Sequence, residues 1–307
     1  MFFGSGAFAV PILEALIASP EVDLVGVVSA PDRPVGRAHE LRSTPLAARA
    51  GQLDVPVLRP ARIRDSAAIE EVAALRPELG ILADYGRIVP PAILDLPEHG
   101  ILNVHPSLLP RHRGATPIPA AILAGDRATG VTIIRMDAGL DTGPIVTSDD
   151  WPLDGTETTP GLESRAAAAG ARLLARTLAG WLDGSLMGRP QDETTATLTR
   201  PLRREDGLLD PGRSAAELER QIRAYQPWPG SYLEGSVGRV VILAGSVAEA
   251  LPRDRPGHLV AHGDGLAFTT GDGRLVLDRV QPAGGRPMSG PEFRRGRGRD
   301  VLGPTLA

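Results

Sequence analysis

The feature that most restricts the fold is an alternation, in the first half of the chain, between short apolar runs and longer segments with helical spacing. The apolar runs cover residues 23–28, 55–58 and 79–82, and the Ala-, Leu- and Glu-rich helical segments lie near 10–18, 43–51 and 65–75. Short strands that alternate with helices build βαβ units, whose strands lie side by side in a parallel sheet. We therefore expect an α/β fold with a parallel sheet.

The sequence pattern changes in the second half of the chain. Residues 188–212 are rich in Arg, Pro, Asp, Thr and Gly and show little apolar periodicity, as a linker does. The apolar segments that follow are short and evenly spaced, which is typical of a small antiparallel barrel. We expect a first domain over residues 1–184, a linker over 185–205 and a second domain over 206–307.

The composition removes several kinds of chemistry. The 307 residues include no cysteine, which excludes disulfides, thiolate metal sites and a cysteine nucleophile. All 33 basic residues are arginine, so Schiff-base catalysis by lysine is excluded as well. The chain lacks a run of about 20 apolar residues, the length that spans a bilayer, and lacks signal-peptide features at its start. We expect a cytoplasmic monomer without a membrane partner.

The formal net charge of −4 is unevenly distributed. Residues 1–200 contain 18 arginines and 24 acidic residues, whereas residues 201–307 contain 15 arginines and 13 acidic residues. The second part is therefore the more basic one. A charge balance of this size does not demand a nucleic-acid partner, which would have to be held by local basic patches.

The stretch 103–143 combines an amide, an imidazole and two carboxylates with turn-forming residues. The apolar run 100–102 predicts a strand that ends at Asn103, and His105 lies two residues further on. Side chains two apart on an extended backbone point to one face, and ligands of open α/β sheets bind at the carboxyl ends of strands. The combination favours a functional site over loops that only join strands to helices.

Two other patterns suggest different functions. The triplet 141–143, Asp-Thr-Gly, also occurs in aspartic proteases, but those enzymes need a second such triplet, which this chain lacks. The spacing Gly4-x-Gly6-x-x-Ala9, between a short strand and a helix, mimics a dinucleotide-binding fingerprint, with Asp32 in place of the ribose-binding acid. A nicotinamide-binding protein, or an RNA-binding module without catalysis, would leave the polar groups of residues 103–141 unused.

Three motifs of this region resemble those of the methionyl-tRNA formyltransferases, within the folate-dependent formyltransferase family. They are Asn103-x-His105, Ser107-Leu108-Leu109-Pro110-x-x-x-Gly114 and Asp137-x-Gly139-x-Asp141-Thr142-Gly143. Supporting matches extend the resemblance over nearly the whole chain, including Tyr85-Gly86-x-Ile88-Val89-Pro90 and Ile222-Arg223-Ala224-x-x-Pro227-Trp228-Pro229. The resemblance singles out Asp141 over Asp137, because the 36-residue interval from His105 to Asp141 is that of the family.

The resemblance implies a Rossmann-like formyltransferase domain followed by an OB-fold-like barrel. It also implies transfer of a formyl group from 10-formyltetrahydrofolate to the α-amino group of initiator methionyl-tRNA, without a metal. The alternative is another 10-formyltetrahydrofolate-dependent formyltransferase that acts on an amino sugar or a small amine. Glycinamide ribonucleotide formyltransferase, a further relative, lacks the second domain.

The catalytic residues that the resemblance implies are Asn103, His105 and Asp141. An amine that attacks a formyl carbon creates an oxyanion and must lose a proton. The Asn103 amide can donate to the oxyanion, and Asp141 can orient the His105 imidazole. His105 itself either shares the oxyanion or moves the proton, and the sequence leaves both roles open.

The binding residues that the resemblance implies lie on several loops. Those expected to bind the folate are Arg87, Ile88, Val89, Ser107, Leu108, Leu109, Pro110 and Leu140, and those expected to bind the tRNA are Arg33 and Arg37. The chain departs from the family pattern at Ser5-Gly6-Ala7, at Ala38-His39-Glu40, which replaces a lysine-rich stretch, and at Asp84, where a small residue is usual.

Overall fold

The computed structural model describes residues 1–35, 40–235, 238–298 and 303–304. Arg37, one of the two expected tRNA-binding residues, lies outside these described residues. The internal contacts divide the chain into two compact units. Unit 1 comprises residues 1–117, 128–152 and 163–200, and unit 2 comprises residues 118–127, 153–162 and 201–307.

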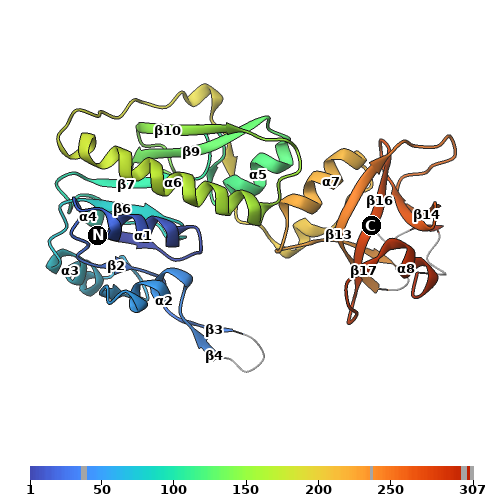
Figure 1. The fold of residues 1–307 in the computed structure, drawn as a ribbon, viewed down its shortest axis with the longest axis horizontal. Coiled ribbons are helices and arrows are strands. Elements are labelled where there is room, and N and C mark those ends of the chain that lie inside the picture. The colour runs from blue at the N-terminus through green and yellow to red at the C-terminus, as the bar shows by residue number, and fades with distance from the viewer. Residues whose placement is uncertain (36–39, 236–237, 299–302, 305–307) are drawn as a thin grey trace. The chain divides into compact units, whose positions relative to one another are not determined.

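A sheet of seven described strands forms the centre of unit 1 (Figure 1). The strands are β1 (Phe2–Gly4), β2 (Val27–Val28), β5 (Val57–Leu58), β6 (Gly80–Ala83), β7 (Ile101–His105), β9 (Ala128–Arg135) and β10 (Ile145–Pro152). Their spatial order is β10-β9-β7-β6-β1-β2-β5. The five strands from β7 to β5 are parallel, which confirms the predicted sheet, whereas β9 and β10 extend it with antiparallel pairing.

The helices that alternate with these strands begin with recognisable sequence signals. They are α1 (Ala9–Ala18), α2 (Pro45–Gln52), α3 (Ser66–Ala74), α4 (Pro91–Leu94), α5 (Pro117–Ala124) and α6 (Thr159–Leu182). In α2, the Thr44 side chain accepts a hydrogen bond from the Ala47 amide, and Pro45 occupies the first helical turn. Both features stabilise a helix start, because proline needs no hydrogen-bond partner there and the capping oxygen satisfies a free amide.

The long helix α6 determines which face of β7 carries the polar side chains. A Cβ atom on Gly170 of α6 would lie 2.8 Å from Cγ1 of Val104, so the helix and the strand approach closely only because residue 170 is glycine. Val104 therefore faces α6. Since neighbouring side chains of a strand point to opposite faces, Asn103 and His105 point away from this helix.

The end of β7 differs from the sequence expectation. A strand ending at Asn103 is predicted from the apolar run, but β7 continues through His105. The antiparallel neighbour β9 pairs along this extension, with Val104 opposite Ile133 and His105 opposite Thr132. Pairing with a strand that is distant in sequence thus keeps Val104 and His105 in extended conformation.

Short elements complete unit 1 and the chain that follows it. They are β3 (Arg33–Val35), β4 (Glu40–Arg42), β8 (Arg113–Gly114), β11 (Leu198–Thr199) and the 3-10 helices η1 (Glu193–Thr195) and η2 (Arg204–Gly207). The strands β3 and β4 form an antiparallel pair, and β11 pairs in parallel with β8. The segment expected to be a linker therefore contributes a strand to unit 1.

Unit 2 is built on an antiparallel sheet, which confirms the predicted barrel-like second domain. Its strands are β12 (Ser231–Gly235), β13 (Gly238–Ala248), β14 (His258–His262), β15 (Gly265–Thr269), β16 (Arg274–Pro282), β17 (Met288–Ser289) and β18 (Gly303–Pro304). The order is β12-β13-β16-β15-β14-β18, and β17 pairs with β16. The helices α7 (Ala215–Ala224) and α8 (Gly290–Arg295) each begin with a capping box.

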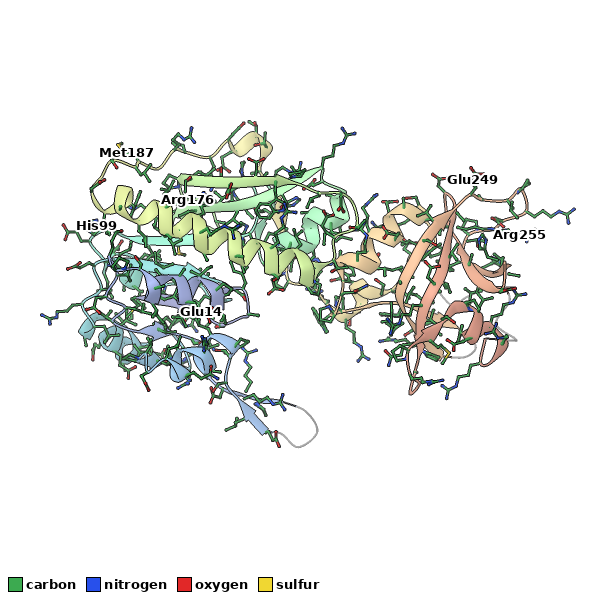
Figure 2. All side chains as sticks on the ribbon, in the orientation of Figure 1. Glu14, His99, Arg176, Met187, Glu249 and Arg255 are labelled. Atoms are coloured by element: carbon green, nitrogen blue, oxygen red, sulfur yellow. The ribbon has the colours of Figure 1, made fainter. Side chains whose placement is uncertain are left out.

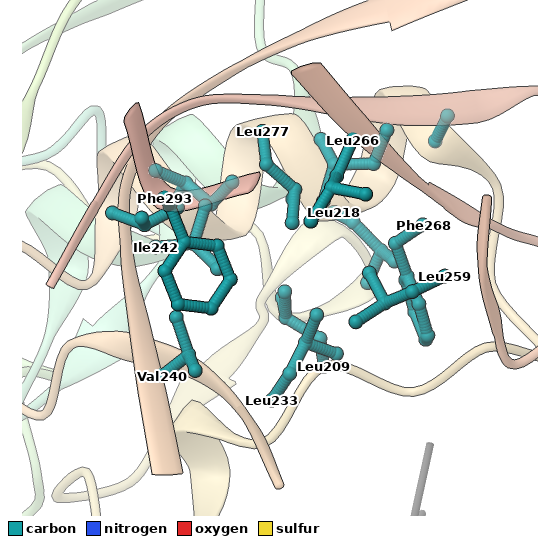
Figure 3. Packing of buried hydrophobic residues seen from close by; sticks show 14 residues of the cluster. Leu209, Leu218, Leu233, Val240, Ile242, Leu259, Leu266, Phe268, Leu277 and Phe293 are labelled. Atoms are coloured by element: carbon teal, nitrogen blue, oxygen red, sulfur yellow. The ribbon is translucent and has the colours of Figure 1, made fainter. Parts of the chain in front are cut away.

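One hydrophobic cluster holds unit 2 together (Figure 3). Phe268 and Leu275 of the sheet are completely buried, and Leu218 of α7 and Phe293 of α8 pack into the same cluster. Strand residues with alternating exposure supply one side of this core and the two helices supply the other. The evenly spaced apolar segments of the sequence are thus the inward-facing residues of the sheet.

Polar side chains on the helices of unit 1 include Glu14 and Arg176, both labelled in Figure 2. Glu14 of α1 pairs with Arg49 of α2 at 2.8 Å, and Arg176 of α6 pairs with Asp149 of β10 at 3.2 Å. Among the residues that the structure describes, no helix has both the length and the apolar character needed to cross a bilayer.

The core of unit 2 gives a stability prediction. We expect Phe268→Ala to lower the free energy of unfolding by about 3–5 kcal/mol, because it removes a buried ring and leaves a cavity. Urea unfolding followed by circular dichroism measures the change. Leu251→Ala is the matched control, since Leu251 is 55% exposed. Equal effects of the two substitutions would contradict the assigned core.

Candidate active site

Three polar side chains of the sequence motifs converge at the carboxyl end of β7. Asn103 Nδ2 donates a hydrogen bond of 3.0 Å to Asp141 Oδ1, and His105 Nδ1 lies 3.6 Å from Asp141 Oδ2. The backbone amide of Gly114 donates to the same Oδ2 atom at 2.8 Å. Asn103 and His105 are buried, and the side chain of Asp141 is 13% exposed. The carboxylate is therefore the hub of a small, mostly buried polar cluster.

The hydrogen bonds of His105 define which ring nitrogen faces the cluster. Its Nε2 atom lies 3.0 Å from the carbonyl oxygen of His112, which can only accept, so Nε2–H is the donor. Burial lowers the pKa of His105, while the Asp141 carboxylate and the His112 carbonyl oppose that shift. A neutral imidazole protonated at Nε2 keeps a lone pair on Nδ1, the nitrogen that faces Asp141 and can take up a proton.

The two aspartates of the glycine-rich loop have different surroundings. Asp137 Oδ1 accepts hydrogen bonds from the Gly139 amide and the Thr142 hydroxyl, at 3.0 and 2.7 Å. Asp137 thus shapes its own loop. Asp141 turns its carboxylate to Asn103 and adopts a positive φ of 53°, which is uncommon outside glycine. The structure therefore brings Asp141, and not Asp137, to the polar end of β7.

The residues expected to form the loop beside the formyl group make contacts within that loop and with β9. Ser107 is fully buried, and its hydroxyl donates to the Arg111 carbonyl at 2.7 Å. The Leu109 amide donates to the Thr132 hydroxyl, which in turn donates to the Ser107 carbonyl. Leu108 packs against Gly130, where a Cβ atom would lie 2.4 Å from its Cδ2. The loop from Ser107 through Pro110 is therefore rigidly attached to β9.

The other expected folate-binding residues differ in exposure. Ile88 and Leu140 are 87% and 58% exposed, so two large apolar side chains of this unit stand in solvent. Val89 is buried in the core of unit 1. The Arg87 guanidinium donates to the carbonyls of Pro60 and Ala61, at 3.1 and 2.6 Å. Ile88 and Leu140 are thus accessible to a ligand, whereas Val89 and Arg87 are held by contacts within the protein.

Arg33, the other expected tRNA-binding residue, is exposed on β3. Within the described ranges, no group of three or more His, Asp or Glu side chains is arranged to hold a metal ion.

The Gly4-x-Gly6 segment serves the packing of the chain on itself. A Cβ atom on Gly4 would lie 2.7 Å from the Ala83 carbonyl, and one on Gly6 would lie 1.6 Å from Asp84 Oδ2. The Asp84 carboxylate thus lies directly beside Gly6, where it would face the pyrophosphate of a dinucleotide bound at this turn. Two anions in this position would repel, so the segment does not suit a dinucleotide.

Asp84 is the residue that departs most from the family pattern, and its environment is unusual. The residue has a positive φ of 48°. Part of its surface is exposed, but burial of the carboxylate and the nearby Glu163 raise the pKa of Asp84 from 3.8 to about 6. The same kind of burial raises the pKa of Glu163.

Three residues of the site were missed by sequence reasoning. Arg113 is 3% exposed and donates to Gln191 Oε1 and to both carboxylate oxygens of Glu193. Gln191 donates to the carbonyls of Asp141 and Gly143. Both partners of Arg113 lie in the segment without periodicity. The only available signal was the position of Arg113 beside Gly114 in a recognised motif.

Two family models match the chain. The model "Formyl transferase" matches residues 1–178, and "Formyl transferase, C-terminal domain" matches residues 201–298. Relatives with similarity over both parts include the methionyl-tRNA formyltransferase of Roseiflexus sp. (strain RS-1), which is 44% identical over 297 residues, 96% of this chain and 91% of the relative. That of Pseudomonas entomophila (strain L48) is 42% identical over 292 residues, 94% of this chain and 93% of the relative. The protein belongs to the formyltransferase family.

Solved structures show the same fold. A Helicobacter canadensis N-formyltransferase in complex with folinic acid and dTDP-3-aminofucose has a TM-score of 0.67 at 18% identity, covering 90% of this chain and 97% of that one. The phosphoribosylglycinamide formyltransferase of Bacillus halodurans has a TM-score of 0.51 at 26% identity, covering 60% of this chain and 95% of that one.

The raised pKa of Asp84 gives a pH-dependent stability prediction. At a pH above about 6, Asp84 is ionised in both the folded and the unfolded protein. Its negative charge is less favourable in the folded protein, so it lowers the free energy of unfolding at neutral pH. We expect Asp84→Asn to raise the melting temperature at neutral pH. The gain should vanish as the pH falls to the ordinary value of 3.8, because both states are then protonated.

Thermal unfolding at a series of pH values measures this effect. Asp150→Asn is a suitable control, because Asp150 is an exposed aspartate of β10. A gain at neutral pH that persists undiminished under acidic conditions would contradict the assigned environment of Asp84.

Proposed function

We propose that this formyltransferase moves the formyl group of 10-formyltetrahydrofolate to the α-amino group of initiator methionyl-tRNA. The observation that carries the proposal is the convergence of three side chains at the end of β7, where Asn103 is hydrogen-bonded to Asp141 at 3.0 Å and His105 Nδ1 lies 3.6 Å from the same carboxylate. Support also comes from the relatives, which are called methionyl-tRNA formyltransferases and are similar over both domains. Since translation initiation is cytoplasmic, we place the activity there, and we expect a monomer to suffice.

The amide of Asn103 suits stabilisation of the developing oxyanion. One of its two N–H groups donates to Asp141, which leaves the second for the formyl oxygen of the substrate. As the amine attacks, the carbonyl bond becomes a C–O⁻ group, and a donor fixed in advance stabilises this charge without reorganisation. The bond to Asp141 holds the amide in the required orientation.

The imidazole of His105 suits proton transfer. Its Nδ1 lone pair accepts a proton from the attacking amine while the new C–N bond forms, and Nδ1–H then protonates N10 of the folate as the old C–N bond breaks. The nearby Asp141 carboxylate stabilises the transient imidazolium. Formyl transfer is then complete, the imidazole is neutral again, and no covalent enzyme intermediate is required.

The donor and the acceptor are proposed to bind to different surfaces of unit 1. The apolar side chains of Ile88 and Leu140 would cover the folate, beside the loop of Ser107, Leu108, Leu109 and Pro110. Arg87 and Val89 would stabilise this surface indirectly. Arg87 donates hydrogen bonds to the carbonyls of Pro60 and Ala61, and Val89 is buried in the core. Arg33 on β3 and Arg37 would bind tRNA phosphates.

An amino-sugar acceptor is the alternative. The structures of sugar formyltransferases share the fold at 15–18% identity, which supports the fold and not the acceptor. A full-length relative at 44% identity supports methionyl-tRNA instead.

The catalytic roles predict the effect of three substitutions. We expect Asn103→Ala, His105→Ala and Asp141→Asn each to lower the single-turnover rate by about 10²-fold or more, as loss of an oxyanion donor or a positioned base does. The assay contains 10-formyltetrahydrofolate and charged initiator tRNA, and formyl-methionine is measured. Asp137→Asn is the matched control, because an amide oxygen can still accept the loop hydrogen bonds. Full activity of His105→Ala would remove His105 from the mechanism.

The proposed tRNA contact gives a separate prediction. We expect Arg33→Ala and Arg37→Ala each to raise the KM for tRNA by about tenfold, the equivalent of about 1.4 kcal/mol. The KM for 10-formyltetrahydrofolate should stay unchanged, because the lost charge binds only phosphate. Steady-state kinetics with each substrate varied in turn separates the two constants. An unaltered tRNA dependence would exclude these arginines from the acceptor site.

A further inference from the structure

A segment that the sequence presents as a linker is bonded along its length to both loops of the active site. We call residues 189–199 the strap; Figure 1 shows this part of the chain in yellow, running beside β10. Its first residue, Arg189, exchanges two backbone hydrogen bonds of 2.8 Å with Ile145 of β10. The strap therefore begins next to the strand that follows the Asp141 loop.

The other end of the strap is bonded to the loop between His105 and Gly114. The Thr197 hydroxyl accepts from the His112 amide at 2.8 Å, and the Thr197 carbonyl accepts from the Arg113 amide at 2.9 Å. His112 is the residue whose carbonyl accepts from His105. Thr199 continues the contact, with its hydroxyl donating to the Arg113 carbonyl at 2.9 Å. The strap thus holds the backbone that orients the His105 ring.

Gln191 connects the two loops through a single side-chain amide. Its Nε2 atom donates to the carbonyls of Asp141 and Gly143, at 2.8 and 2.7 Å. Its Oε1 atom accepts from Nε and Nη2 of Arg113, at 3.0 and 2.8 Å. The donors and acceptors around the amide fix its orientation, because carbonyls cannot donate and a guanidinium cannot accept.

Arg113 is itself anchored. Its guanidinium is bonded to both carboxylate oxygens of Glu193, at 2.7 and 2.9 Å, in the paired geometry that gives the strongest ion pairs. Because the Arg113 side chain is only 4% exposed, the pair holds a buried charge in one place. Gln191 is therefore attached to a rigid support.

Asp141 is the residue that needs such support. Its backbone has a φ of 53°, in the left-handed region that few residues other than glycine, asparagine and aspartate adopt. The two carbonyls bound by Gln191 are that of Asp141 itself and that of Gly143, two residues on. Because both peptide groups are fixed, the direction in which the Asp141 side chain points from the backbone is fixed as well.

We propose that Gln191, anchored by Arg113 and Glu193, is a positioning residue that holds the Asp141 carboxylate against Asn103 and His105. This inference rests on the proposed formyl transfer, in which Asp141 stabilises the imidazolium. Gln191 does not touch the reacting atoms in this scheme. It acts through the backbone of the Asp141 loop.

The test uses Gln191→Met in the full-length protein, which removes both donors at similar side-chain length and adds no charge. We expect kcat to fall by about 10–100-fold, as for a catalytic group displaced by about 1 Å, with both KM values nearly unchanged. Gln191→Glu is the second variant, because it keeps an acceptor for Arg113 and replaces the two donors with a charged oxygen that the carbonyls of Asp141 and Gly143 repel. It should lose activity similarly. Thr194→Ala is the strap control, since the Thr194 hydroxyl donates to Asp192 within the strap.

A second readout does not depend on activity. Since the Asp141 carboxylate raises the pKa of His105, its displacement should lower that pKa further, which NMR titration of the imidazole measures. Wild-type kcat in both variants, together with an unchanged His105 titration in the uncharged variant Gln191→Met, would overturn the inference. Absence of formyl-methionine with the wild-type protein would instead overturn the proposed function, and the titration would still test the positioning.

Discussion

The site depends on one carboxylate at which three separate parts of the chain meet. Asp141 accepts from the side chain of Asn103 and the backbone of Gly114 and lies 3.6 Å from the His105 ring. A mostly buried carboxylate is stable only where donors surround it. The strand β7, the loop that contains Gly114 and the glycine-rich loop that contains Asp141 must therefore all be folded before the carboxylate charge is stable at this position.

Much of this arrangement was predictable from the sequence. The alternation of apolar runs and helices predicted the parallel sheet. The position of Asn103 and His105 after residues 100–102 predicted that both lie at the carboxyl end of a strand. The motif spacing distinguished Asp141 from Asp137. The structure adds the physical reason, because Asp137 accepts hydrogen bonds from Gly139 and Thr142 in its own loop.

What the sequence could not provide are contacts between segments far apart in the chain. The antiparallel addition of β9 extends β7 through His105, although no apolar run marks that extension. The bonds of Gln191 to Arg113 join residues 78 positions apart, and neither residue lies in a periodic segment. Patterns of apolar residues report on local structure and burial, whereas a hydrogen-bonded segment of polar residues leaves no period to detect. Such a segment is easily taken for a linker.

The fixed place of residues 189–199 has a consequence for the order in which the protein is made. The ribosome releases the chain from its N-terminus, and domains fold largely as they emerge. The sheet and α6 are complete by Leu182, yet the bonds to Asp141, Gly143 and Arg113 come from residues synthesised later. A nascent chain that has folded its sheet thus still lacks a finished active site. On the proposed role of Gln191, catalytic competence would arise only when the segment leading into the second domain has left the ribosome.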